Sequence, residues 1–142
     1  MRQPIAFFAT AAAAALLSYA TPALTQQTSV PANIAGAVAD TNRPQTDKDL
    51  DAQRKPAEML TFAGVKAGDK VLEFVPGRGY VTRLLAKAVG PAGHVYGANL
   101  PTFNEAFRTG VDPIIASPAY GNVSKFEQPF SEIRAPEPLD VA

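Results

Sequence analysis

The arrangement of hydrophobic and polar positions predicts a strand–helix–strand unit in the middle of the chain. Val71–Val75 is a short, largely apolar run rich in β-branched residues, which is typical of a buried strand. A helix is predicted from Tyr80, because apolar residues follow at the i, i+3, i+4, i+7 spacing of a core-facing stripe: Val81, Leu84, Leu85 and Ala88. A second strand is predicted over His94–Asn99. Two strands joined by a helix in this way should be parallel.

The flanking segments continue this α/β pattern. Before the first strand, short helices are predicted over 47–55 and from Pro56, a residue suited to a first helical turn, to Gly64. After the second strand, Asn122–Glu127 reads as a third strand. Leu139–Ala142 reads as the opening of a fourth strand, so the domain looks truncated at its C-terminal side and the first strand should be an open edge. Such an edge could pair with a second copy.

The N-terminal segment has the pattern of an export signal. Arg2 precedes Ile5–Leu17, a run of apolar and small residues that is shorter than the roughly 20 residues needed to span a bilayer. Small residues follow, which predicts a signal peptide over 1–23, cleaved between residues 20 and 25, and a periplasmic protein with no stable membrane span after cleavage. An alanine-rich buried helix is the alternative. Residues 24–46 carry little charge and predict a flexible linker before a domain at 47–142.

Composition narrows the possible chemistry. The 142 residues include 13 basic and 13 acidic side chains, which does not favour a nucleic-acid binder. The absence of cysteine excludes a disulfide framework and thiolate chemistry, and with His94 as the single histidine the sequence predicts no metal site and no hydrolytic triad. Arg54 and Lys55 could meet an anionic ligand or lie on a solvated face.

The loop after the first strand is the candidate binding site. In a strand–helix–strand unit a ligand sits at the carboxyl end of the first strand, over the loop that leads into the helix. Gly77 and Gly79 in this loop would let a ligand approach the backbone, but a dinucleotide site has a third glycine where this chain has Thr82. Glu73, at the end of the strand, would repel a pyrophosphate and attract a cationic ligand. Alternatively, Glu73 is a strand residue that faces solvent at the end of the sheet and binds no ligand.

The run Val71–Tyr80 resembles motif I of the class I S-adenosylmethionine-dependent methyltransferases. Arg54–Glu58 and His94–Asn99 resemble, more narrowly, an exported bacterial group labelled predicted methyltransferases, and the resemblance covers 46–142. It implies the N-terminal half of a Rossmann-like three-layer α/β sandwich, with about three parallel strands and flanking helices. Two positions differ from the motif: Val75 replaces a glycine, and Asn99 replaces an Asp or Glu.

The same resemblance implies S-adenosylmethionine as the cofactor and a role for each of five residues. Glu73 would contact the methionine ammonium, Pro76, Gly77 and Gly79 would let the cofactor lie against the backbone, and Asn99 would occupy the ribose-binding position. As a neutral acceptor, Asn99 should bind the nucleoside more weakly than a carboxylate does. Asn99 could equally be a turn residue before Leu100.

The expected function is methyl transfer to an unknown acceptor, with this chain carrying the cofactor-binding half of the enzyme. Methyl transfer depends mainly on alignment, so a chain poor in acid–base side chains is compatible with it, and no catalytic residue is assigned. The alternatives are a non-catalytic module that binds a nucleoside or self-associates, and a dinucleotide oxidoreductase, which Glu73 and Thr82 disfavour.

Overall fold

The fold is known from a computed structural model, which describes residues 29–142. The predicted signal peptide, 1–23, and residues 24–28 of the predicted linker lie outside this part of the chain. The described part of the chain comprises the predicted domain, 47–142, and the 18 residues before it.

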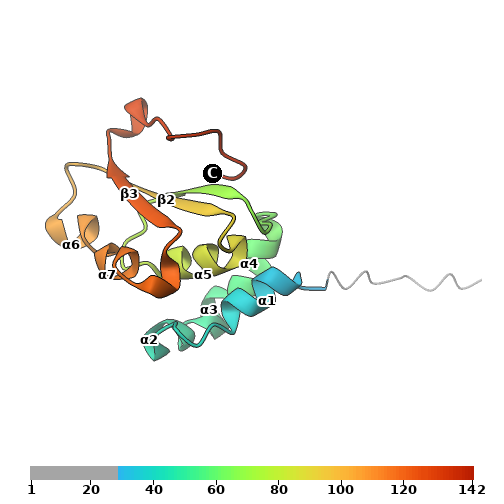
Figure 1. The fold of residues 1–142 in the computed structure, drawn as a ribbon. Helices are drawn as coiled ribbons and strands as arrows, with labels where there is room; N and C mark the ends of the chain where they lie inside the picture. The colour runs from blue at the N-terminus through green and yellow to red at the C-terminus, as the bar shows by residue number, and fades with distance from the viewer. Residues whose placement is uncertain (1–28) are drawn as a thin grey trace, which may run out of the picture.

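Three parallel strands form an open sheet (Figure 1). They are β1 (Lys70–Phe74), β2 (His94–Asn99) and β3 (Val123–Glu127), in the order β1-β2-β3. Leu72 of β1 is in register with Tyr96 of β2, which in turn is in register with Ser124 of β3. The predicted Rossmann-like α/β fold with about three parallel strands is therefore confirmed.

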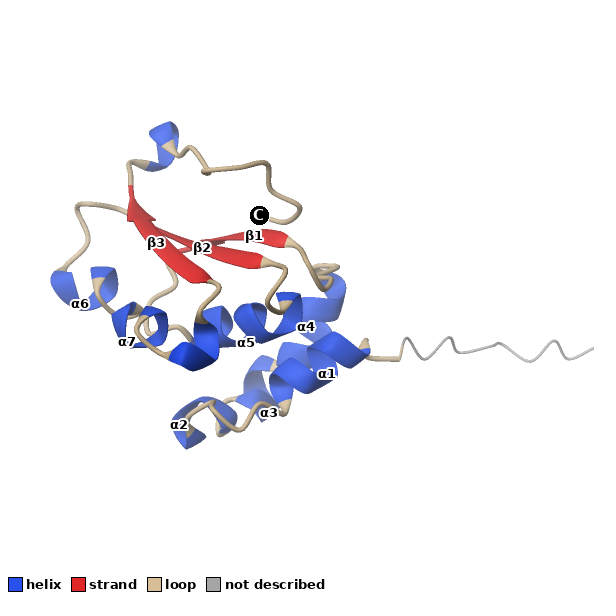
Figure 2. Ribbon diagram, in the orientation of Figure 1, coloured by secondary structure: helices blue, strands red, loops and turns tan. Residues whose placement is uncertain are grey.

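The α-helices lie on one face of this sheet (Figure 2). Helix α5 (Tyr80–Val89) connects β1 to β2, and α6 (Glu105–Arg108), α7 (Asp112–Ile115) and the 3-10 helix η1 (Pro118–Tyr120) connect β2 to β3. The opposite face carries the 3-10 helix η2 (Phe130–Glu132) and the C-terminal segment. No helix in the described part of the chain has the length and apolar character to cross a bilayer.

The main hydrophobic core fills the space between the sheet and α5. Leu84 is fully buried, and Leu85 and Ala88 are buried beside it, as the helical spacing predicts. The sheet contributes side chains that alternate along each strand toward this face: Val71, Val95 and Val123. The residues between them, Leu72 and Tyr96, point to the other face and pack with Phe126, Ile133 and Leu139 of the later chain.

The prediction of a flexible linker is wrong from residue 32 onward. Helix α1 (Ala32–Val38) packs against α5 and buries Ile34 and Ala37, each 1% exposed. Asn33 fixes the contact, because its side-chain amide donates to the Ala88 carbonyl at 3.0 Å. The low charge that suggested a linker has another cause: α1 faces the core with small and apolar residues.

The predicted helix over 47–55 is two shorter helices, α2 (Gln45–Lys48) and α3 (Asp51–Arg54). The first of them, α2, begins at Gln45, ahead of the predicted start at residue 47. Helix α3 stops at Lys55, whose φ of 47° is left-handed, and α4 (Pro56–Phe62) begins at the next residue with proline in its first position.

The outer edge of β1 is partly covered, where an open edge was expected. The amide of Leu72 donates to the Val141 carbonyl at 2.9 Å, and the Val141 amide donates to Lys70 at 3.2 Å. This parallel bridge occupies the position that a fourth strand takes in the predicted fold. The C-terminal residues therefore protect the first half of β1 from strand pairing.

The packing of α1 gives a first test. Ile34→Ala should lower the free energy of unfolding by about 2–5 kcal/mol, because it removes buried methyl groups and leaves a cavity against α5. Urea denaturation followed by circular dichroism measures the change. Val30→Ala is the control, since Val30 is 41% exposed, and should change stability by less than about 0.5 kcal/mol. Equal stability of Ile34→Ala and the unaltered protein would restore the linker interpretation.

Candidate functional site

The loop between β1 and α5 turns sharply because several of its residues are left-handed. Val75 has a φ of 55°, Gly77 a φ of 56° and Gly79 a φ of 78°. Glycine adopts this conformation without cost, whereas a β-branched residue is strained there. Val75 is held in place by its amide, which donates to the Ala98 carbonyl of β2 at 2.8 Å.

A cavity of about 680 Å³ opens beside this loop, at the carboxyl end of β1. Three of the five predicted site residues line it: Glu73, Pro76 and Gly77. The N-terminal helices supply the facing wall through Asp47, Leu50 and Arg54, and Phe107 of α6 adds an aromatic ring. The cavity thus lies where a parallel α/β sheet places its ligands.

Glu73 is a partly buried carboxyl that forms no ion pair with a basic side chain among residues 29–142. Burial raises its pKa from 4.5 to about 7, against the smaller lowering effect of a hydrogen bond that Thr82 donates to Oε2 at 2.6 Å. Thr82, where a dinucleotide site would have glycine, is itself fully buried and serves to orient this carboxyl. A carboxylate in such a position favours a cationic ligand.

The two loop glycines have different roles. A Cβ on Gly77 would meet only the Val75 carbonyl, at 3.9 Å, so the backbone here is open to a ligand in the cavity. A Cβ on Gly79 would lie 2.0 Å from Cδ1 of Ile114, so this position is occupied by packing against α7. Gly79 thus lets α7 seat against the loop, and its expected contact with a cofactor stays a prediction.

Asn99 lies at the end of β2, as predicted, but it does not line the cavity. Its side chain is fully buried, and neither Oδ1 nor Nδ2 has a hydrogen-bond partner among residues 29–142. Buried side-chain amides are nearly always hydrogen-bonded. Two unmet hydrogen-bonding groups at the carboxyl end of β2 fit a polar ligand group that completes them, such as a ribose hydroxyl pair.

The segment after β2 packs closely on the glycine loop. A Cβ on Gly110 would lie 2.1 Å from the Gly77 carbonyl oxygen, so only glycine permits this approach. Lys125 of β3 donates to the Arg108 carbonyl at 2.8 Å and forms an ion pair with Asp112. These contacts close one side of the site with residues that sequence spacing alone does not bring together.

A buried ion pair fixes the facing wall. The side chain of Arg43 is fully buried, and its two terminal nitrogens donate to Asp51 at 2.6 and 2.9 Å. Tyr80, the first residue of α5, donates its hydroxyl to the same carboxylate at 2.7 Å. Asp51 therefore ties the N-terminal segment to the helix that follows the glycine loop, and its pKa is lowered chiefly by the Arg43 hydrogen bonds, against the raising effect of burial.

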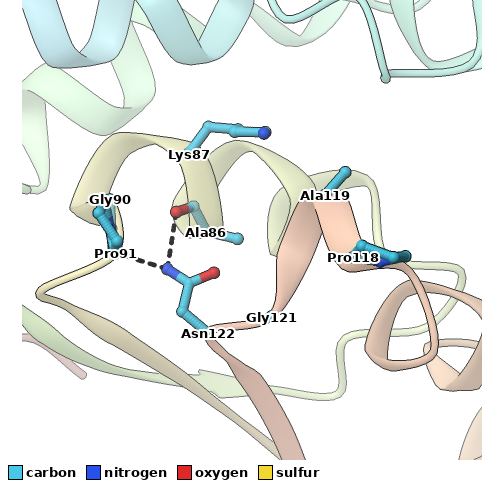
Figure 3. Close-up of a pocket in the computed structure, with 8 residues that line it drawn as sticks. All are labelled: Ala86, Lys87, Gly90, Pro91, Pro118, Ala119, Gly121 and Asn122. Atoms are coloured by element: carbon cyan, nitrogen blue, oxygen red, sulfur yellow. Dashed lines mark hydrogen bonds between the residues drawn. The ribbon is translucent and has the colours of Figure 1, made fainter.

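A second cavity, of about 470 Å³, lies at the other end of α5 (Figure 3). The side chain of Asn122 points into this region and donates to the carbonyls of Ala86 and Gly90, at 2.9 and 2.8 Å. These are carbonyls of the last helical turn, which need partners. Lys87 is the one ionisable residue in the lining. The polar groups of this cavity therefore serve to cap the end of α5, and they do not form a reaction site.

Comparison with known proteins relates part of the chain to methyltransferases. No protein-family model matches it. Over 47 residues, 33% of its length, the chain is 45% identical to protein-L-isoaspartate O-methyltransferase of Ignicoccus hospitalis, of which it covers 22%.

Solved structures of similar arrangement include a SAM-dependent methyltransferase from Aquifex aeolicus, with a TM-score of 0.49 and 25% identity over 64% of this chain and 50% of that one. Another is fibrillarin of Aeropyrum pernix, solved with natively bound S-adenosyl-L-methionine, with a TM-score of 0.39 and 19% identity over 45% of this chain and 26% of that one. The chain thus spans half or less of each of these proteins.

The strain at Val75 gives a second test. Glycine is ordinarily less stable than alanine by about 0.5–1 kcal/mol, but in a left-handed position alanine is disfavoured by about 1–2 kcal/mol. At residue 75 we expect this order to be reversed, with Val75→Gly more stable than Val75→Ala by about 1 kcal/mol. Chemical denaturation of the two variants measures the difference. Greater stability of Val75→Ala would show that the backbone at residue 75 is unstrained.

The buried carboxyl gives a third test. The pKa of Glu73 is about 7 in the folded protein against 4.5 for an ordinary glutamate, so the folded state holds an extra proton between these pH values. The resulting stabilisation is complete below pH 4.5 and is lost as pH rises through 7. Its size is on the order of 3 kcal/mol, at about 1.4 kcal/mol for each pKa unit.

Glu73→Gln should remove this fall in stability, and urea denaturation at a series of pH values measures it. The matched control is Glu58→Gln, at an exposed glutamate of α4, which should keep the slope of the unaltered protein. If the free energy of unfolding varied with pH in the same way for Glu73→Gln and for the unaltered protein, the raised pKa of Glu73 would be contradicted.

Proposed function

We propose that this chain binds S-adenosylmethionine in the cavity beside the glycine loop and forms the cofactor-binding part of a methyltransferase. The observation that carries the proposal is Glu73, a partly buried carboxyl that lines the cavity at the end of β1 and forms no ion pair with a basic side chain in the described part of the chain. The cofactor has a positive ammonium and a positive sulfonium, and it has no phosphate.

The residues around the cavity fit the parts of this molecule. Glu73 would hold the ammonium through Oε1, while Thr82 occupies Oε2. Pro76 and the exposed backbone at Gly77 would lie beneath the cofactor. Asn99 would meet the ribose hydroxyls, because its buried side-chain amide has no partner among residues 29–142 and can both donate and accept.

The same features disfavour a dinucleotide. A pyrophosphate in the glycine loop would lie near the Glu73 carboxylate, and like charges in a partly buried site repel strongly. Thr82 further replaces the glycine that packs the helix closely against the strand in dinucleotide-binding proteins. The similarity to a methyltransferase over 47 residues agrees with this preference.

The chain would contribute to the reaction by positioning. When bound, S-adenosylmethionine supplies an electrophilic methyl group on its sulfonium, which an acceptor attacks in line. Glu73 and the loop backbone would orient the amino-acid end, and Phe107 would exclude water from one side of the cavity. Alignment of this kind is a large contribution to catalysis and needs no dedicated acid or base. The acceptor is left unassigned.

Calorimetric titration tests the proposal. At pH 8, where Glu73 is ionised, both S-adenosylmethionine and S-adenosylhomocysteine should bind, and the affinity should fall about tenfold at pH 6, where only about a tenth of Glu73 is charged. Glu73→Gln should bind weakly at both pH values, with little change between them.

A nicotinamide dinucleotide serves as the ligand control and should give no heat of binding. The proposal fails if neither adenosyl ligand binds to protein whose fold is verified by circular dichroism. Tight binding of the dinucleotide would instead support an oxidoreductase.

A further inference from the structure

Two side chains of opposite charge line the same cavity without pairing with each other. Glu73 stands at the end of β1, and Arg54 stands at the end of α3 on the facing wall. Among the described residues the ion pairs of the chain do not include either of them. Arg54 also makes no contribution to the pKa of Glu73, whose causes are burial and Thr82. Among residues 29–142, the cavity therefore presents an acid and a base, Glu73 and Arg54, that form no ion pair with the protein itself.

Arg54 is held at the cavity wall by a rigid support. Its guanidinium lies over the ring of Tyr80, 4.6 Å from the centroid. Tyr80 cannot easily turn away, because its hydroxyl donates to Asp51, which the buried Arg43 holds in turn. The planar face of Arg54 is thus occupied by stacking, while its N–H edge remains available for an anion.

The other charged groups in the cavity wall are differently placed. Asp47 accepts a hydrogen bond from Arg83 at 3.0 Å, so its charge is already paired. Arg54 and Arg78 are both exposed, but Arg78, in the glycine loop, stacks on no aromatic ring among residues 29–142. Of the two arginines in the cavity lining, Arg54 is therefore the one that an aromatic ring holds in position.

We propose that Arg54 binds the carboxylate of the cofactor's amino-acid end, so that Glu73 and Arg54 together recognise its zwitterionic group. This inference rests on the proposed function and adds a specificity-determining residue to it. A guanidinium and a carboxylate form paired hydrogen bonds of good geometry, and these are among the stronger polar contacts in proteins. The site would accordingly distinguish ligands that keep the carboxylate from ligands that lack it.

Decarboxylated S-adenosylmethionine provides the test, because it keeps the adenosine, the sulfonium and the ammonium and lacks only the carboxylate. The unaltered protein should bind S-adenosylmethionine about tenfold more tightly than this analogue. Arg54→Gln should weaken the binding of S-adenosylmethionine about tenfold and leave that of the analogue within twofold, so that the preference disappears. Titration calorimetry of both ligands at pH 8 gives the four affinities.

Two further variants sharpen the result. Arg54→Lys keeps the charge but loses the planar, two-pronged geometry, and should retain part of the preference. Arg78→Gln removes the other cation of the wall that has no ion-pair partner among residues 29–142, and should leave the preference intact. Thermal unfolding of each variant establishes that it is folded at the temperature of the titration.

The possible failures are distinguishable. If the unaltered protein binds neither ligand, the proposed function fails and this inference with it. If it binds both but Arg54→Gln weakens both equally, Arg54 supports the wall through Tyr80 and does not contact the carboxylate. If Arg78→Gln, and not Arg54→Gln, lost the preference for S-adenosylmethionine over the decarboxylated analogue, the carboxylate would be bound by Arg78 in the glycine loop. Each of these outcomes overturns the proposal for Arg54.

Discussion

The ion pair between Arg43 and Asp51 couples the N-terminal helices to the site. Arg43 is fully buried, so the desolvation of its charge is tolerable only while Asp51 and the Val38 carbonyl accept its hydrogen bonds. Asp51 in turn accepts from Tyr80, the residue at which the glycine loop becomes helix α5. The position of the facing wall, and with it the width of the cavity, thus depends on one carboxylate that serves two donors.

The sequence predicted the central elements well because their pattern is local. The second strand begins and ends where expected. Helix α5 begins at Tyr80 and ends before Gly90, because the glycine-rich segments on either side interrupt the helix at these positions. Before the first strand the same reasoning failed. The burial of Ile34 and the break between α2 and α3 depend on contacts with α5 and on Arg43, which no local pattern reveals.

In the candidate site, too, some features could be predicted from the local sequence and others depend on tertiary packing. Glu73, Pro76 and Gly77 could be placed from the order strand, loop, helix, and all three line the cavity. The orientation of Glu73 by Thr82 could also have been suspected, because Thr82 is nine residues later on the first helical turns that face the strand. The sealing of Asn99 and the stacking of Arg54 on Tyr80 depend on tertiary packing and required the structure.

The contact between Gly79 and Ile114 has a consequence for which residues position 79 can accept. Because the side chain of Ile114 fills the place of a Cβ at Gly79, any other residue there would push α7 away from the loop. The same position also has a left-handed backbone, with a φ of 78°, which glycine adopts most easily. One glycine thus meets two separate demands, of packing and of backbone conformation, and a substitution there would disturb both the turn and the helix packed against it.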